Sequence, residues 1–103
     1  MSADALSVHW STRALERVSE AGDYLAQYDA VNAERWVEDL FEKLEQVAVL
    51  PGMGRIVPEL GRSEIREVFH HKYRVIYKIK ATRIEVLTVR HMRQRFDEGE
   101  IGR

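Results

Sequence analysis

The sequence predicts an α+β fold in which an N-terminal helical hairpin packs on a mainly antiparallel, curved sheet. Apolar residues recur every three or four positions up to about residue 49, which is the period of an amphipathic helix. From about residue 65 they alternate with polar residues, which is the period of a strand. Pro51-Gly52 separates the two patterns, since proline ends a helix and glycine tolerates a reversed backbone. The predicted order of elements is β-α-α-β-β-β.

The first half of the chain is expected to form a strand and two helices. Residues 6–10 are a short apolar segment that is typical of a strand. Ser11 or Thr12 could cap a first helix, and Asp29 could cap a longer one that ends before Pro51. So few residues connect the helices that they must turn back on each other. The helix stripes predict that three aromatic side chains lie in the core: Tyr28, Trp36 and Phe41.

The second half is expected to form three strands. Residues 73–80 and 84–89 alternate between apolar and polar positions, and residues 65–70 do so less regularly. His71-Lys72 has the length of a tight hairpin connection, and residues 81–82 suit the next turn. The helices would cover one face of this sheet, and we expect arginines on the other face.

Length and composition limit the class of protein. A chain of 103 residues that is 45% hydrophobic suits one domain over residues 1–103, with its core in about 6–95. It has no cysteine, so it can form neither a disulfide nor a thiolate metal site. It shows no secretory signal and no apolar run of the roughly 18 residues that cross a bilayer. We therefore expect a cytoplasmic protein without a membrane span.

The two halves of the chain carry opposite net charge. Residues 1–50 contain four basic and ten acidic residues, a net charge of −6. Residues 51–103 contain twelve basic and seven acidic residues, a net charge of +5. This asymmetry favours a negatively charged partner for the second half, either nucleic acid or an acidic protein segment. The alternative is an ordinary charged surface that happens to be sorted along the chain.

A helical hairpin followed by four short segments resembles the toxins of the RelE/ParE superfamily, over roughly residues 6–95. The segments are Leu50-Pro51-x-x-Gly54-Arg55, Ile65-Arg66-Glu67, Tyr73-Arg74-Val75-Ile76-Tyr77 and Val89-x-His91-x-Arg93. The resemblance implies the toxin of a type II toxin–antitoxin, or plasmid stabilisation, module, held inactive by a cognate antitoxin that is ParD-like or similar. RelE-like and YoeB-like members cut messenger RNA on the ribosome, whereas ParE-like members inhibit DNA gyrase.

The nuclease alternative implies a metal-independent endoribonuclease, which needs a base, a cation for the phosphate and an acid. By position in the motif, Glu59 matches the base of YoeB-like members and Arg74 matches their phosphate-binding arginine. Those members have a tyrosine or a His-Tyr pair just after the last strand, where this chain has Met92-Arg93. His91 is one position away, so its side chain would point to the opposite face. This departure favours the ParE-like branch, a gyrase inhibitor that is not an enzyme.

In the ParE-like interpretation, basic residues of the sheet and its last strand bind the target. The predicted set is Arg66, Arg74, Arg90, His91, Arg93 and Arg95. Arg66 and Arg74 could instead lie on a solvated face, paired with Glu64 or Glu67. No spacing of histidine and carboxylate residues is typical of a metal site, so we expect neither metal nor cofactor. A further possibility is a degenerate toxin that retains only antitoxin binding.

Overall fold

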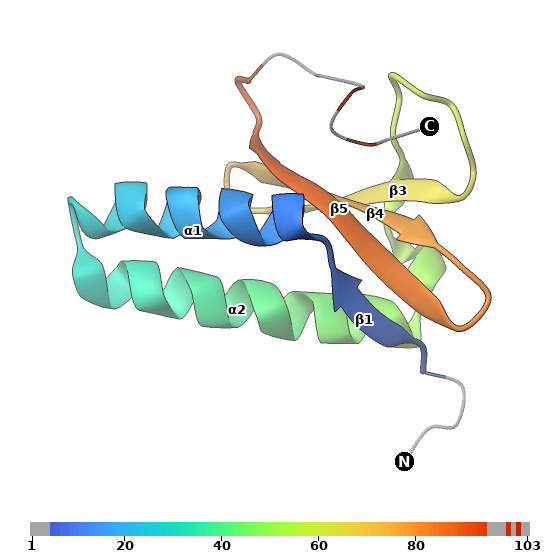
Figure 1. Ribbon diagram of the computed structural model, residues 1–103, viewed down its shortest axis with the longest axis horizontal. Coiled ribbons are helices and arrows are strands. Elements are labelled where there is room, and N and C mark those ends of the chain that lie inside the picture. The colour runs from blue at the N-terminus through green and yellow to red at the C-terminus, as the bar shows by residue number, and fades with distance from the viewer. Residues whose placement is uncertain (1–4, 95–98, 100, 102–103) are drawn as a thin grey trace.

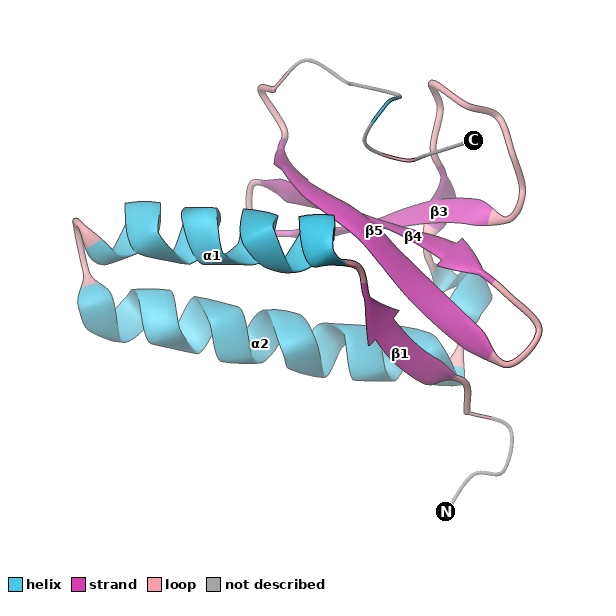
Figure 2. Cartoon of the chain, in the orientation of Figure 1, coloured by secondary structure: helices cyan, strands magenta, loops and turns pink. Residues whose placement is uncertain are grey.

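The computed structural model describes residues 5–94, 99 and 101. The elements over these residues are β1 (Ser7–Trp10), α1 (Thr12–Ala26), α2 (Ala30–Val49), a 3₁₀ turn (Pro51–Met53), β2 (Arg55–Ile56), β3 (Ile65–His70), β4 (Tyr73–Ile79) and β5 (Arg83–His91). The predicted α+β order is confirmed, with one addition: β2 is a two-residue strand that the sequence pattern did not indicate. The two helices lie side by side, with the strands gathered beside them (Figures 1 and 2).

Within the described residues, the strands form one five-stranded sheet in the order β1-β5-β4-β3-β2. The first strand is parallel to β5, with Val8 opposite Ile84, and the other neighbours are antiparallel. The pairing of β4 with β5 shifts register between Ile76 and Tyr77. Such a bulge bends a strand and increases its twist. Because β1 and β5 form the parallel pair and the other described neighbours are antiparallel, the prediction of a mainly antiparallel sheet is confirmed.

Both helices begin at caps that the sequence indicated. Ser11 Oγ accepts a hydrogen bond of 3.0 Å from the Ala14 amide, so Ser11 rather than Thr12 is the cap of α1. The same hydroxyl donates to the Leu87 carbonyl at 2.9 Å, which ties the start of the helix to β5. Asp29 caps α2 by accepting from the Asn32 amide at 3.1 Å. These caps satisfy amides that the helix itself leaves unpaired.

The main core lies between the helices and the sheet. Leu40 and Leu44 of α2 are fully buried there with Val75 and Tyr77 of β4. On the opposite face, a second apolar cluster covers part of the sheet. Its members are Val57, Ile65, Ile76 and Ile101, with Leu60 and Leu87 packed against them. Arginines do lie on this face, as predicted, but it also carries this apolar cluster, which the sequence did not indicate.

One predicted core residue is exposed. Trp36 is buried, and Phe41 is partly buried and packs on Trp10 with ring centroids 4.5 Å apart. Tyr28, in contrast, is 74% exposed. It follows the end of α1 in the connection between the helices, which projects beyond the sheet (Figure 1). The helix periodicity therefore placed Tyr28 in the core wrongly. None of the helices described is long and apolar enough to cross a membrane.

His70 on β3 is a buried titratable side chain, with 4% of its surface exposed. Its Nε2 lies 2.9 Å from the Trp36 carbonyl oxygen, to which the neutral ring donates a hydrogen bond. The pKa of His70 is below its ordinary value, and burial is the largest cause of this shift. The charges of His71 and Lys43 lower this pKa further, while the Trp36 carbonyl and Asp39 oppose the shift.

Acidification below about pH 6.5 should therefore destabilise the fold. In this range His70 binds a proton in the unfolded chain but not in the folded chain, where its pKa is lower. The loss continues down to the lowered pKa of the folded state, by at most about 1.4 kcal/mol per pH unit. Urea denaturation between about pH 5 and pH 7.5 measures this loss. His70→Gln is the control, since glutamine keeps a donor for the Trp36 carbonyl but does not titrate. The same pH dependence in both proteins would mean that His70 is not its source.

Candidate functional site

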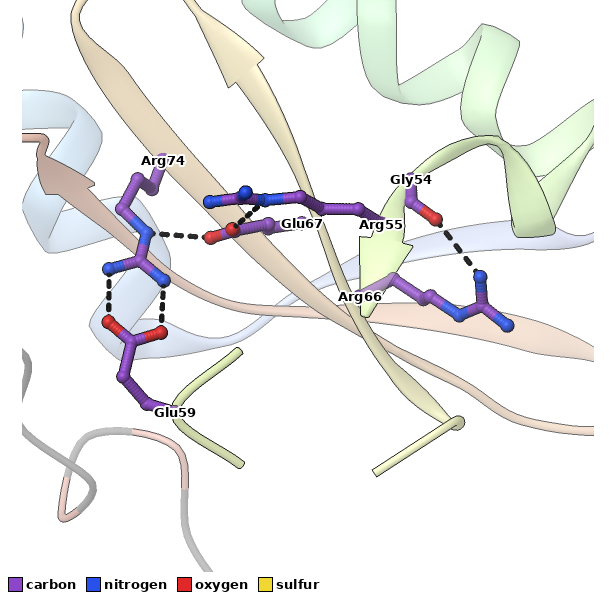
Figure 3. Close-up of polar contacts among 6 residues, drawn as sticks. All are labelled: Gly54, Arg55, Glu59, Arg66, Glu67 and Arg74. Carbon is purple, nitrogen blue, oxygen red and sulfur yellow. Dashed lines mark hydrogen bonds and ion pairs between the residues drawn. The ribbon is translucent and has the colours of Figure 1, made fainter. Parts of the chain in front are cut away.

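Four charged residues on the face opposite the helices form an arginine–glutamate cluster: Arg55, Glu59, Glu67 and Arg74 (Figure 3). Arg74 Nε donates to Glu67 Oε1 at 2.6 Å. The other two guanidinium nitrogens donate to Glu59 Oε2 at 2.8 Å and Oε1 at 2.7 Å. Arg55 Nε donates to Glu67 Oε2 at 2.6 Å. Each carboxylate oxygen in the cluster thus has an arginine donor.

Strand pairing and one loop bring these residues together. Arg55 lies directly opposite Glu67 in the pairing of β2 with β3. Glu67 shares its face with Ile65 of the second apolar cluster, because side chains alternate along a strand. Glu59 returns to the sheet on the loop after β2, where the Gly61 amide bonds to the Val57 carbonyl at 3.0 Å. Gly61 has a φ of +64°, which favours glycine at this position.

Two members of the cluster, Glu67 and Arg74, are largely withdrawn from water. The Glu67 side chain is fully buried, and the Arg74 side chain is 12% exposed. Hydrogen bonds from Arg74 are the largest cause of a lowered pKa at Glu59, and Arg55 contributes through its charge. Glu59 in turn is the largest cause of a raised pKa at Arg74. A general base works best when its pKa is near the working pH. Glu59 is therefore poorly suited to remove a proton.

His91 lies on the other face of the sheet. It is opposite Tyr73 in the pairing of β4 with β5, and their ring centroids are 5.2 Å apart. Tyr73 packs against the main core on the helix side. Arg74, the next residue along β4, points the opposite way. His91 Nδ1 accepts a 3.0 Å hydrogen bond from the Arg93 amide. The structure therefore brings Glu59 and Arg74 together and leaves His91 apart from them.

The other predicted binding residues do not gather on one surface. Arg66 donates to the Gly54 carbonyl at 3.1 Å and points away from the arginine–glutamate cluster (Figure 3). Arg90 is directly opposite Arg74, on the face away from the helices. Arg93 is exposed just after β5. Arg95 lies outside the described residues.

Comparison with known protein families finds a match over most of the chain. The family model described as "ParE toxin of type II toxin-antitoxin system, parDE" matches residues 8–96, which is most of the chain. The chain belongs to the ParE toxin family. The family predicted from the sequence motifs is therefore confirmed for the ParE branch.

A solved structure of the same fold is described as "Chromosomal ParDE TA system from P. aeruginosa". It is similar to this ParE-family chain with a TM-score of 0.68 and 17% sequence identity. The similarity covers 86% of this chain and 98% of the other chain. At this identity the likeness shows the shared fold. A search of curated proteins finds no match.

The ParE-family chain also has a hollow of about 500 Å³ on the helix side, between the end of α1, the β3–β4 turn and the end of β5. We call it the aromatic groove. Its rings are those of Tyr24, Trp36, His71, Tyr73 and His91, and its cations are Lys72 and Arg93.

The sequence patterns did not indicate this groove, because its residues come from four separate segments. One signal in the sequence points to part of it: His71 stands at a turn position where glycine or asparagine is common. In the part of the chain that is described, three or more potential metal ligands do not come together anywhere.

Proposed function

We propose that this ParE-family chain acts as the toxin of its toxin–antitoxin module by binding DNA gyrase. A cognate antitoxin would neutralise it. The observation that carries this proposal is the separation of the three nuclease candidates. Glu59 and Arg74 are paired on one face of the sheet, and His91 lies on the other face. An inhibitor that acts by binding needs no such convergence.

The separation matters because RNA cleavage requires its groups within reach of the same phosphate. A base, a phosphate-binding cation and an acid each contribute only when they contact the reacting atoms. Both oxygens of Glu59 are already bonded to Arg74, at 2.7 and 2.8 Å. That pairing also holds the pKa of Glu59 below its ordinary value. The same contacts suit a structural role that fixes the loop after β2 to the sheet.

Charge supports a protein partner for neutralisation. The second half of the chain has a net charge of +5, and exposed cations include Arg55, Lys72 and Arg93. An acidic, partly disordered antitoxin tail that folds on binding would complement this charge. The antitoxin is therefore proposed to associate quickly at low salt, where steering between opposite charges is strongest.

Glu59→Gln should leave toxicity nearly unchanged. Glutamine keeps the size of the side chain and one acceptor for Arg74; it removes the acid–base function, and with it the charge and the second hydrogen bond to Arg74. We expect inhibition of plasmid supercoiling by purified gyrase at a concentration within about threefold of wild type. Arg93→Glu should weaken the same inhibition, because it reverses a charge in the predicted binding set.

A ribosome-dependent endoribonuclease would give the opposite ranking. Loss of its base would reduce cleavage by about 10²–10⁴-fold, while Arg93→Glu would matter little. Transcript ends mapped in cells that express the chain would then accumulate at ribosomal A-site codons. That result, or abolished toxicity in Glu59→Gln that still binds antitoxin, would overturn the gyrase proposal.

A further inference from the structure

The aromatic groove combines a buried floor with exposed walls. Trp36 forms the floor and is 7% exposed, and the Tyr73 ring meets it edge-on with centroids 5.1 Å apart. Tyr24 stands at the wall and is 55% exposed. Rigid aromatic rings in a hollow of this kind can enclose one large apolar side chain of a partner.

The charged side chains that line the groove, Lys72 and Arg93, are both cationic. Lys72 and Arg93 are exposed at its rim, and His71 and His91 add two imidazoles. Among the residues that the structure describes, no carboxylate lines this groove. Lysine and arginine side chains only donate hydrogen bonds, so the rim favours a ligand that presents carboxylates or other anions.

His71 lies at the edge of this groove, in the tight turn between β3 and β4. Its φ of +54° is in the left-handed region that such two-residue turns use. Its ring packs edge-on against the buried His70, with centroids 4.7 Å apart. The turn and the contact with His70 hold the His71 ring at the edge of the groove.

The surroundings of the groove disfavour a long polyanion. The adjoining hollow on one side contains Glu20, and the one on the other side contains Asp29 and Asp39. A nucleic acid strand that continued past the groove would meet these carboxylates. A short acidic protein segment with one apolar anchor would not extend that far.

We infer that the aromatic groove is the docking site for an acidic segment of the target protein. A large apolar side chain of that segment would enter between Tyr24 and Tyr73, and its neighbouring carboxylates would pair with Lys72 and Arg93. The inference rests on the proposed function, since His91 and Arg93 belong to the predicted target-binding set and both line the groove. Arg74 and Arg90 lie on the opposite face, and so are not contact residues.

Two groove substitutions at exposed positions test this inference in a gyrase supercoiling assay. Tyr24→Ala should raise the inhibitory concentration at least tenfold, because it removes an aromatic anchor from the wall. Lys72→Glu should raise it by about three- to tenfold, with a larger effect at low salt than at high salt. Thermal unfolding confirms that each variant is folded, and co-purification with antitoxin measures neutralisation separately.

Arg62→Glu is the matched charge reversal. Arg62 is 41% exposed and pairs with Glu64 in the loop after β2, outside the groove. It should inhibit gyrase as wild type does. Equal inhibition by wild type and both groove variants would overturn the inference, and so would an equal loss in Arg62→Glu. Variants that lose antitoxin binding but still inhibit gyrase would assign the groove to the antitoxin instead. A wild-type chain without effect on gyrase would overturn the proposed function, and the inference with it.

Discussion

Arg74→Met should lower the free energy of unfolding by about 3 kcal/mol, as expected when a buried charge loses a partner. Glu67 has no exposed side-chain surface, and its two oxygens bond to Arg74 and Arg55 at 2.6 Å each. Arg55 is itself 56% exposed, so it offers only a partly solvated counter-ion. Methionine fills similar space to arginine but donates no hydrogen bond. Urea denaturation of the purified chain gives the difference in free energy.

A second substitution separates loss of charge pairing from loss of packing. Glu67→Gln in the Arg74→Met background should restore about 2 kcal/mol, because a neutral amide needs no counter-ion. Arg62→Met is the control, since Arg62 and Glu64 are about 40% exposed and such a pair contributes less than about 1 kcal/mol. If Arg74→Met cost no more than Arg62→Met, the buried carboxylate would not depend on Arg74.

The long elements could be predicted because each has a period set by packing on one core. The side chains of Ser11 and Asp29 each accept a hydrogen bond from the amide three residues later in the chain. The starts of both helices could therefore be predicted from the local sequence. The two residues of β2 are too few to show any alternation. Tyr28 continues the stripe of α1 in the sequence, but the helix ends at Ala26 and the Tyr28 side chain is 74% exposed.

The arginine–glutamate cluster could not be predicted, because it depends on contacts between distant parts of the chain. In the sequence, Glu67 is an ordinary polar residue among arginines, and the pattern predicts its pairing with Arg66 or Arg74 only on an exposed surface. In the fold Glu67 is bonded to Arg55 of β2 and to Arg74 of β4, and Glu59 of the loop after β2 pairs with the same Arg74. One signal was present: Glu67 stands between Ile65 and Phe69 on the same face of its strand.

Gly54→Ala should also destabilise the chain, by about 3 kcal/mol. A Cβ at this position would lie 2.4 Å from the Tyr77 hydroxyl oxygen and 2.7 Å from the Glu67 carbonyl oxygen. Two hydrogen bonds hold the hydroxyl in place: it accepts from the Gly54 amide at 3.1 Å and donates to the Pro51 carbonyl at 2.5 Å. Gly54 has a φ of −75°, so the cost comes from this close approach and not from its backbone conformation.

Gly52→Ala is the control for the loss of glycine itself, since a Cβ there would meet no atom within 4 Å. It should change the free energy of unfolding by less than about 1 kcal/mol. Tyr77→Phe should lose the two hydrogen bonds of the hydroxyl, at about 1–3 kcal/mol. Adding Gly54→Ala to Tyr77→Phe should then cost less than Gly54→Ala alone, because one of the two clashes is gone. Full additivity of the two substitutions, measured by urea denaturation, would show that the hydroxyl does not restrict position 54.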